Sequence, residues 1–308
     1  MDKKRNQWKA WLYLLPAIII LLVFTVWPII NTIRMSLLVN YDSNKEIGGT
    51  VFSFGFNNFK KIATFYRFKD CLKTTVLLTV LTVPISTMLA LIIAVALNSI
   101  KFVRKTFQTI FFLPYVTNTI AIGMVFAAMF TMIGAVSGRE PDSIGIINTI
   151  IEAFGGKRIN WVNGGSTYAA NITVLTIYIV WNALPFKILV LLGGLQSVNK
   201  QYYEAAKIDG TSRFRTFWRI TVPMLSPMIA YVVITGFIGG FKEYSSVLGI
   251  FGPSMGPGNH EVDTMVGLIY DSLKANQGTA SAGALILFAI IFAVTLVNLY
   301  VSKKKVHY

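Results

Sequence analysis

Apolar residues along the chain come in long runs that are separated by polar segments. A helix needs about 20 apolar residues to cross the hydrocarbon core of a membrane, and six runs are long enough. The runs do not alternate as the strands of a membrane β-barrel do, and helices satisfy their own backbone hydrogen bonds inside lipid. The six runs are Leu12 to Ile33, Thr75 to Leu97, Phe107 to Met132, Ala170 to Leu195, Leu225 to Val247 and Ala280 to Val301. We therefore predict an all-α integral membrane protein with six transmembrane helices in residues 12–301, a tail at 1–11 and a tail at 302–308.

The charged residues agree with a membrane protein and predict its orientation. Only 13% of residues are charged, against about 25% in soluble domains. The net charge of +15 does not form one basic patch for nucleic acid, because Lys and Arg are concentrated in the four segments on one side of the predicted spans. The positive-inside rule places those segments, and both termini, in the cytoplasm. The first run ends without a small-residue cleavage site, so we expect a retained helix rather than a signal peptide.

The loop at residues 199–223 is too polar to cross a membrane, although it lies between two apolar runs. Its sequence EAAKIDGTSRFRTFWRITVP predicts two short helices. Gly210 allows a positive φ that ends the first helix, and Thr211 or Ser212 can cap the second. Pro223 is expected to stop the segment. Such a pair of helices either lies in the headgroup region, with its aromatic residues in lipid, or docks a cytoplasmic partner that moves the flanking spans.

The residue spacing in this loop resembles the EAA loop of ABC-transporter permeases. That pattern is Glu-Ala-Ala, three residues, Gly, nine residues, Ile, one residue and Leu-Pro. This chain follows it from Glu204 to Pro223, with Val222 in place of Leu. The resemblance implies coupling helices that sit in a cleft of a separate ATPase subunit, with Glu204 paired to a basic residue there and Gly210 at the bend. The coupling positions that it implies are Glu204, Ala205, Ala206, Asp209, Gly210, Phe214, Ile220 and Pro223.

Further segments resemble the carbohydrate-uptake branch of these permeases, which includes the maltose-type and multiple-sugar permeases. They are WNALPFKILVLLGGLQSVNKQYYEAAKIDGTSRFRTFWRITVPMLSP, FGFNNFKKI, TFQTIFFLPYV and INWVN. The resemblance implies the six-helix permease fold in the cytoplasmic membrane of a bacterium or archaeon. It also implies import of a sugar or oligosaccharide delivered by an extracellular binding protein. The implied partners are a second, similar permease chain in a heterodimer and two copies of an ABC ATPase.

The chain itself carries no nucleotide-binding or catalytic motif. It lacks Gly-x4-Gly-Lys-Ser/Thr, so ATP and magnesium are expected on the ATPase, and no cofactor or metal is expected on this chain. Both histidines lie outside the apolar runs, and no carboxylates pair inside them, which disfavours an intramembrane enzyme. An ABC permease for a polyamine, phosphate, amino acid or glycerol-phosphate is the main alternative. A secondary transporter or channel would explain six spans but not the spacing of the loop.

The fourth and fifth runs carry candidate substrate-pathway residues, since aromatic faces with a few polar groups suit a sugar. In the fourth run Pro185 can bend the helix, and resemblance at VWNALPF implies sugar contacts from Ile179, Trp181, Ala183 and Phe186. In the fifth run the polar amides of the maltose-type relative are replaced by Phe237 and Gly240, which implies that the partner permease holds more of the substrate. Aromatic residues at this depth can also simply pack against other helices, and the glycines favour close packing. The candidates are Ile179, Trp181, Asn182, Phe186, Phe237, Gly240, Phe241 and Tyr244.

Lys187 places a charge inside the otherwise apolar fourth run. An ionisable residue in a span is by default a functional candidate, and this one could attract an anionic sugar. It lies about two turns from the inner end of the helix, so we expect its side chain to reach the headgroups. Lys242 and Glu243 lie near the outer end of the fifth run, where we expect them to meet water. The segment GIFGPSMGPGNHEVDTM that follows is either a plain turn or, as its resemblance to the carbohydrate-uptake branch implies, a turn that faces the binding protein.

Overall fold

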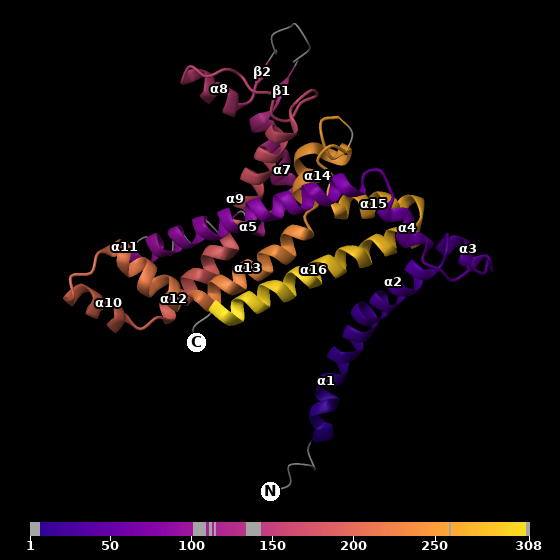
Figure 1. The fold of residues 1–308 in the computed structure, drawn as a ribbon, viewed down its shortest axis with the longest axis horizontal. Helices are drawn as coiled ribbons and strands as arrows, with labels where there is room; N and C mark the ends of the chain where they lie inside the picture. The colour runs from indigo at the N-terminus through magenta and orange to yellow at the C-terminus, as the bar shows by residue number, and fades with distance from the viewer. Residues whose placement is uncertain are drawn as a thin grey trace. The chain divides into compact units, whose positions relative to one another are not determined.

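The computed structural model describes residues 7–100, 109, 110, 113, 115–133, 143–258 and 260–305. The chain divides into two compact units. The first contains Met1–Phe68 and Leu268–Ala289, and the second contains Lys69–Gly267 and Ile290–Tyr308. Figure 1 shows that helices make up most of the described chain, so the all-α prediction is confirmed. Of the predicted tails, residues 7–11 belong to the first helix and residues 302–305 to the last one, and the other tail residues lie outside the described part of the chain.

The first unit begins with a long apolar helix. None of the most apolar 18-residue window of this helix is buried, so its side chains are available to lipid or to another protein. Two short helices and parts of two C-terminal helices complete the unit. Its elements are α1 (Gln7–Leu21), the π turn η1 (Leu22–Val26), α2 (Trp27–Leu37), α3 (Ser43–Ile47), α4 (Asn57–Ala63), most of α15 (Met265–Ala275) and the first part of α16 (Gln277–Lys305).

Asn58, at the start of α4, joins this helix to the end of α2. Its Nδ2 donates to the carbonyl oxygens of Ser36 (3.0 Å) and Leu38 (2.8 Å) at the end of α2. Gly278 in α16 packs against the same amide, because a Cβ at this glycine would lie 2.8 Å from Asn58 Nδ2. A buried amide that satisfies two carbonyls thus fixes the chain where α2 ends.

The second unit contains the longer helices, and two β-strands of two residues each form an antiparallel pair with Met132 opposite Ile144. Its elements up to the loop are α5 (Phe68–Ser99), α7 (Thr119–Phe130), β1 (Met132–Ile133), β2 (Ser143–Ile144), α8 (Ile146–Ala153) and α9 (Tyr168–Ser197). The loop and its surroundings form α10 (Lys200–Ile208), α11 (Arg213–Thr216), the π turn η2 (Phe217–Thr221), α12 (Val222–Met224), α13 (Ser226–Phe241), α14 (Ser245–Phe251) and the 3-10 turn η3 (Gly252–Ser254).

Helices α5 and α9 are the centre of the second unit. In their most apolar windows, 44% of α5 and 50% of α9 is buried. Two apolar cores join them, the first together with α7 and α14 and the second together with α13. The two cores lie at different levels along α9. The part of α9 between them is therefore not filled by either core. Representative members are Leu78, Phe130, Leu175 and Val247 in the first core and Leu91, Leu191, Leu225 and Val232 in the second.

Among the residues that the structure describes, four helices are long and apolar enough to cross a membrane, and they correspond to the first, second, fourth and sixth predicted runs. A fifth span is present if the two helices on either side of Leu225, which are bent by 70°, cross together. The four long helices are Trp11–Leu37, Phe68–Ser99, Tyr168–Ser197 and Gln277–Lys304, and the bent pair is Arg213–Met224 and Ser226–Phe241.

The third and fifth runs differ from the prediction. Part of the third run lies outside the described residues, and its described part forms α7, which is apolar but has only 12 residues. The prediction that the fifth span reaches Val247 is wrong, because α13 ends at Phe241 and α14 begins separately at Ser245. A carboxylate just before Ser245 starts the new helix, as described below.

Helices α7 and α14 meet through two glycines. A Cβ at Gly123 would lie 2.8 Å from the Cα of Gly249, and a Cβ at Gly249 would lie 3.1 Å from the Cα of Gly123. Neither position has room for a side chain, so the two backbones approach as membrane helices with small interface residues do.

We expect Gly123→Ala to lower the Tm of the detergent-solubilised chain. Forcing a methyl group into this contact destabilises by about 1–3 kcal/mol, as overpacking does. Gly193→Ala is the matched control, because nothing lies within 4 Å of a Cβ at Gly193 in α9 and alanine favours a helix over glycine. Equal Tm values for the two variants would contradict the packing of α7 on α14.

Candidate functional site

The loop between α9 and α13 folds into the two short helices that the sequence predicts. Asn199 caps α10, since its Oδ1 accepts a hydrogen bond from the backbone N–H of Gln201 (3.0 Å). Gly210 follows α10 with a φ of 66°, in the left-handed region that glycine adopts without strain. Ser212, one of the two predicted caps, accepts from the backbone N–H of Arg215 (3.4 Å) and starts α11.

The second helix of the loop runs further than predicted. From α11 through η2 and α12 it continues past Pro223 and ends at Met224, one residue beyond the predicted stop and just before α13. The π turn of Phe217–Thr221 comes directly before this proline, where regular α-helical geometry would bring the ring against a preceding carbonyl. The chain changes direction at Leu225 instead, with a bend of 70° into α13.

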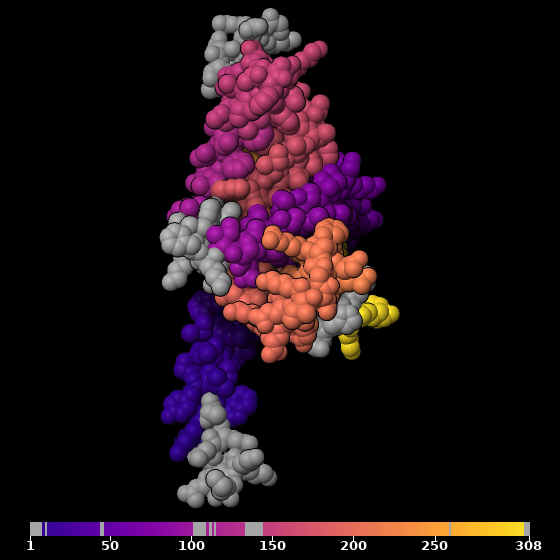
Figure 2. Space-filling view, turned by 90° about the vertical axis from the view of Figure 1, so that its left-hand side faces the viewer, coloured from indigo at the N-terminus to yellow at the C-terminus, as the bar shows by residue number. Residues whose placement is uncertain are grey.

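The loop presents an open surface with a hollow of 360 Å³ between its two helices. Figure 2 shows the orange helices of the loop on the face turned toward the viewer. Among the predicted coupling positions, Glu204 and Phe214 are exposed outside the hollow. Ala206 is buried, so its small size lets the helices approach closely. The coupling positions that line the hollow are Ala205, Ala206, Asp209 and Ile220.

Leu225 joins the loop to α9. Its side chain is 1% exposed, and it packs where α9 has no side chain, because a Cβ at Gly194 would lie 3.0 Å from Leu225 Cδ2 and 2.7 Å from Met228 Cγ. Close-packed contacts transmit displacement because they leave no free space. The end of the loop, the start of α13 and the inner part of α9 are therefore packed against one another at Leu225.

A cavity of 310 Å³ lies between α5, α9 and α13, at the lower end of the range of about 300–1,000 Å³ for ligand pockets. Its wall combines apolar surface with hydroxyl and amide groups, a lysine, a glutamate and two aromatic rings. The wall includes Ser86 of α5, Asn182, Phe186 and Lys187 of α9, Tyr115, and Glu243 after α13.

Half of the predicted substrate-pathway residues line this cavity, namely Ile179, Asn182, Phe186 and Gly240. Trp181 instead packs against Phe126 of α7, with ring centroids 5.2 Å apart. Phe241 is buried, and Tyr244 packs on the first core. The residues outside the wall are Trp181, Phe237, Phe241 and Tyr244. Contact of any of these side chains with a substrate stays a prediction.

Two aromatic rings form a flat part of the wall. Tyr115 and Phe186 are stacked, with centroids 6.1 Å apart and an interplanar angle of 16°. Tyr231 of α13 packs at a tilt against Phe186, at 6.4 Å. Aromatic surface of this kind next to an amide and hydroxyl groups suits a ligand with apolar faces and polar edges.

Lys187 points into the protein, so the prediction that it reaches the headgroups is wrong. Its side chain is 4% exposed. The Nζ donates to Val83 O (3.2 Å), Ser86 Oγ (2.7 Å) and Thr87 Oγ1 (2.9 Å) of α5. The physical reason is that α5 offers three oxygens at the depth of this lysine, and they replace the water that the headgroup region would supply.

Close packing of the fifth-run glycines is confirmed at two of three positions. A Cβ at Gly240 would lie 2.8 Å from Thr79 Cγ2, and a Cβ at Gly236 would lie 3.1 Å from Val83 Cγ1. Nothing lies within 4 Å of a Cβ at Gly239. Glycine thus lets α13 approach α5 and keeps part of the cavity open.

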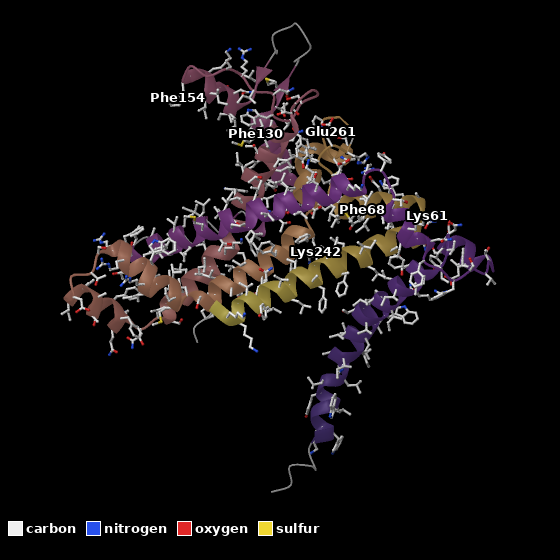
Figure 3. The ribbon with its side chains drawn as sticks, in the orientation of Figure 1. Lys61, Phe68, Phe130, Phe154, Lys242 and Glu261 are labelled. Carbon is white, nitrogen blue, oxygen red and sulfur yellow. The ribbon has the colours of Figure 1, made fainter. Side chains whose placement is uncertain are left out.

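Glu243, at the end of α13, is predicted to meet water, but its side chain also accepts hydrogen bonds from the backbone. Its Oε1 accepts hydrogen bonds from the backbone N–H groups of Tyr244 (3.1 Å) and Ser246 (3.0 Å). A carboxylate at this place stabilises the first turn of a helix, which explains why α14 begins here. Its neighbour Lys242, labelled in Figure 3, is exposed as the sequence predicts.

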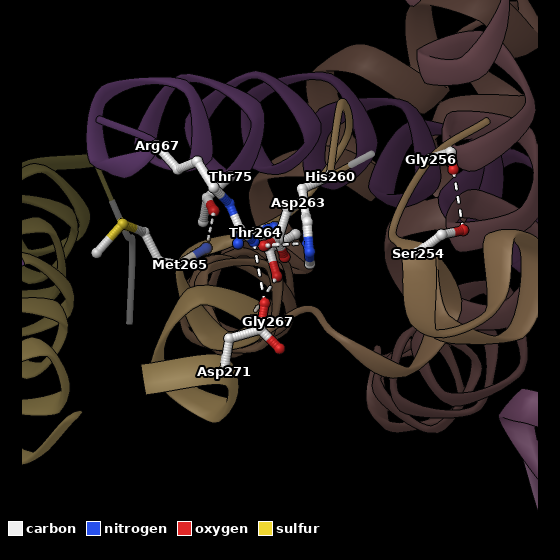
Figure 4. A network of polar contacts seen from close by, with 10 residues as sticks. All are labelled: Arg67, Thr75, Ser254, Gly256, His260, Asp263, Thr264, Met265, Gly267 and Asp271. Atoms are coloured by element: carbon white, nitrogen blue, oxygen red, sulfur yellow. Dashed lines mark hydrogen bonds and ion pairs between the residues drawn. The ribbon is translucent and has the colours of Figure 1, made fainter. Parts of the chain in front are cut away.

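The segment after α14 is tied back to α5 by polar contacts, drawn in Figure 4. Thr75 Oγ1 accepts from the backbone N–H of Met265 (2.9 Å). Asp263 is 1% exposed, its Oδ1 accepts from the backbone N–H of Thr264 (2.7 Å), and its Oδ2 lies 3.5 Å from His260 Nδ1. The segment is therefore fixed to α5 and to itself by polar contacts. Its role toward a binding protein stays a prediction.

Sequence reasoning missed the contribution of α5 to the cavity, although a signal is present. Hydroxyl residues recur four positions apart along this otherwise apolar run, in the pairs Thr75 with Thr79 and Thr82 with Ser86. Residues four apart share one helix face, and all four are buried. Tyr115 and Glu243 carry no comparable signal, because only the fold brings them to the cavity.

A family model described as the inner membrane component of binding-protein-dependent transport systems matches residues 77–307. The match takes in α9, α13 and the loop between them. The chain belongs to this family. It is thus a multi-pass membrane permease, the membrane subunit of a transport system that depends on a binding protein.

The permease is similar to proteins with related descriptions. It is 31% identical to the arabinooligosaccharides transport system permease protein AraP of Bacillus subtilis, over 95% of this chain and 88% of that protein. It is 30% identical to the multiple sugar-binding transport system permease protein MsmF of Streptococcus mutans, over 98% of each chain. A chain of a bacterial alginate ABC transporter, solved in complex with an alginate pentasaccharide-bound periplasmic protein, has the same fold. The TM-score is 0.80 at 21% identity, over 98% of this chain and 96% of that one.

We expect a cysteine at Glu204 to react with a hydrophilic maleimide at least about tenfold faster than one at Ala206, because a buried thiol reacts only after local opening. Both sites lie on α10, so Glu204→Cys and Ala206→Cys form a matched pair. The unmodified permease gives the background, since its single cysteine, Cys71, is 1% exposed. Equal labelling rates in detergent would contradict the arrangement of the loop.

Proposed function

We propose that the permease carries a sugar or oligosaccharide across the membrane in an ATP-driven ABC importer. The observation that carries this proposal is the physical link from an exposed two-helix loop, through buried Leu225, to the helices that line the cavity. The names of AraP and MsmF, which refer to arabinooligosaccharides and multiple sugars, support a saccharide as the solute. The stacked pair Tyr115 and Phe186 beside Asn182 suits the faces and hydroxyls of a sugar ring.

In the proposed assembly the permease works with several partner chains. We infer six transmembrane helices, with both termini in the cytoplasm of a bacterium or archaeon. A second, similar permease chain completes the pathway as a heterodimer, and an extracellular binding protein delivers the saccharide. Two copies of an ABC ATPase bind ATP and magnesium and dock on the loop at residues 199–223.

In the proposed mechanism the loop converts movement of the ATPase into a change at the cavity. Glu204 pairs with a basic group of the ATPase, and the helices on either side of Gly210 move as that subunit closes. Leu225 passes the displacement to α9 and α13, which carry most of the cavity wall. The cavity then opens toward the binding protein, and return of the loop after hydrolysis resets it.

We expect Glu204→Lys to reduce saccharide uptake at least about tenfold in proteoliposomes that contain the assembled transporter. Reversing one partner of a close charge pair costs about 2–5 kcal/mol. Gln201→Lys is the matched control, because it places a lysine on the same exposed helix outside the coupling positions. Uptake, ATP hydrolysis stimulated by the binding protein, and the amount of ATPase bound are measured for each variant.

Two results would contradict the proposal in different ways. Normal uptake and normal stimulated hydrolysis with Glu204→Lys would show that the loop does not couple the ATPase to transport. Uptake of a polyamine, phosphate or amino acid, without uptake of any saccharide, would support the role as an importer subunit but contradict a saccharide as the solute.

A further inference from the structure

The position of Lys187 has a consequence for the chemistry of the solute. Its Nζ has three oxygen partners, Val83 O, Ser86 Oγ and Thr87 Oγ1. Three acceptors match the three N–H donors of an ammonium group. Each of these acceptors is a neutral oxygen, so the contacts satisfy the hydrogen bonds of the group without cancelling its charge.

The hydroxyl groups of α5 are oriented to accept from this lysine. Ser86 Oγ donates to the carbonyl oxygen of Thr82 (2.5 Å), and Thr87 Oγ1 donates to that of Val83 (2.7 Å). Each hydroxyl has one proton and two lone pairs, so these bonds use the proton and leave lone pairs toward Nζ. The Lys187 ammonium is therefore held in place at the cavity wall rather than free to swing to the membrane surface.

The positive charge of this group has no counter-ion in the part of the chain that the structure describes. No carboxylate of those residues lies within 4.0 Å of Lys187 Nζ. Glu243 is the other ionisable group of the wall besides Tyr115; it forms no direct ion pair with Lys187, and its Oε1 accepts from Tyr244 N and Ser246 N at the start of α14. A buried charge without an opposite charge is unfavourable, and such residues within spans mark ligand or ion pathways.

We propose that Lys187 is a specificity-determining residue that receives an anionic group of the transported saccharide, a carboxylate or a phosphate. This inference rests on the proposed function and narrows it to acidic saccharides. The contact of Lys187 Nζ with Val83 O is the longest of the three, and that carbonyl also accepts from Thr87. An incoming anionic oxygen replaces this contact, while Asn182 and Phe186 in the same wall face the rest of the sugar.

The test uses the assembled transporter in proteoliposomes with its binding protein. Three probes are compared: a neutral trisaccharide, a trisaccharide of uronic acids and a phosphorylated disaccharide. The second and third probes distinguish a carboxylate from a phosphate as the anionic group. We expect uptake of at least one anionic probe, a loss of at least about tenfold in that uptake with Lys187→Met, and retention with Lys187→Arg, because removing one side of a buried charge pair costs about 2–5 kcal/mol.

Lys242→Met is the matched control, because it makes the same chemical change at an exposed lysine outside the cavity wall. Uptake is normalised to the amount of assembled transporter. Ser86→Ala serves as a second variant if Lys187→Met does not assemble. It keeps the charge and removes the shortest of the three contacts, so we expect a raised KM for the anionic probe with assembly retained.

Several results would overturn this inference. The first is uptake of the neutral trisaccharide alone by the unmodified transporter. The second is unchanged uptake of the anionic probe by Lys187→Met, or an equal loss of that uptake with Lys242→Met. The third is an unchanged KM for the anionic probe with Ser86→Ala. Uptake of the neutral trisaccharide alone would leave the proposed saccharide importer standing. Uptake of no saccharide by the unmodified transporter would instead remove the proposed function, and this inference with it.

Discussion

The packing of α5 against α9 is the constraint on which the rest of the second unit depends. Inside a bilayer, polar groups find partners within the protein or remain unsatisfied. The two helices meet through apolar cores at two levels, and between these levels the Lys187 ammonium bonds to oxygens of α5. Helix α13 then approaches α5 through Gly236 and Gly240, and the space that remains is the cavity. The same arrangement that satisfies a buried charge therefore also builds the site.

The sequence predicts those features that depend on length and local chemistry. Four runs correspond to long apolar helices, because about 20 apolar residues have few alternatives to a membrane helix. Gly210 and Ser212 act as predicted, because a left-handed residue and a cap are local properties. The predicted end of the fifth span is wrong because the Glu243 carboxylate accepts from backbone N–H groups at the start of α14, and an apolar run does not show where one helix stops and the next begins.

The environment of Lys187 shows why the candidate site is harder to predict than the fold. Its depth on α9 is visible in the sequence and favours the headgroups. Its actual partners belong to α5, about a hundred residues earlier in the chain. Trp181, which the sequence places among the substrate-pathway candidates, lies next to cavity residues along α9 but packs against Phe126 of α7. Which side of a buried helix faces a cavity is decided by packing partners, and the sequence contains no direct signal of them.

In the proposed mechanism, movement of the loop at residues 199–223 changes access to the cavity through Leu225. This can be measured as the rate at which a hydrophilic thiol reagent, added from the side of the binding protein, labels Asn182→Cys in the assembled transporter. We expect a higher rate when a non-hydrolysable ATP analogue and the binding protein are bound than without nucleotide. We also expect Glu204→Lys to abolish this difference. A labelling rate that does not change with nucleotide would show that the loop does not control access to the cavity.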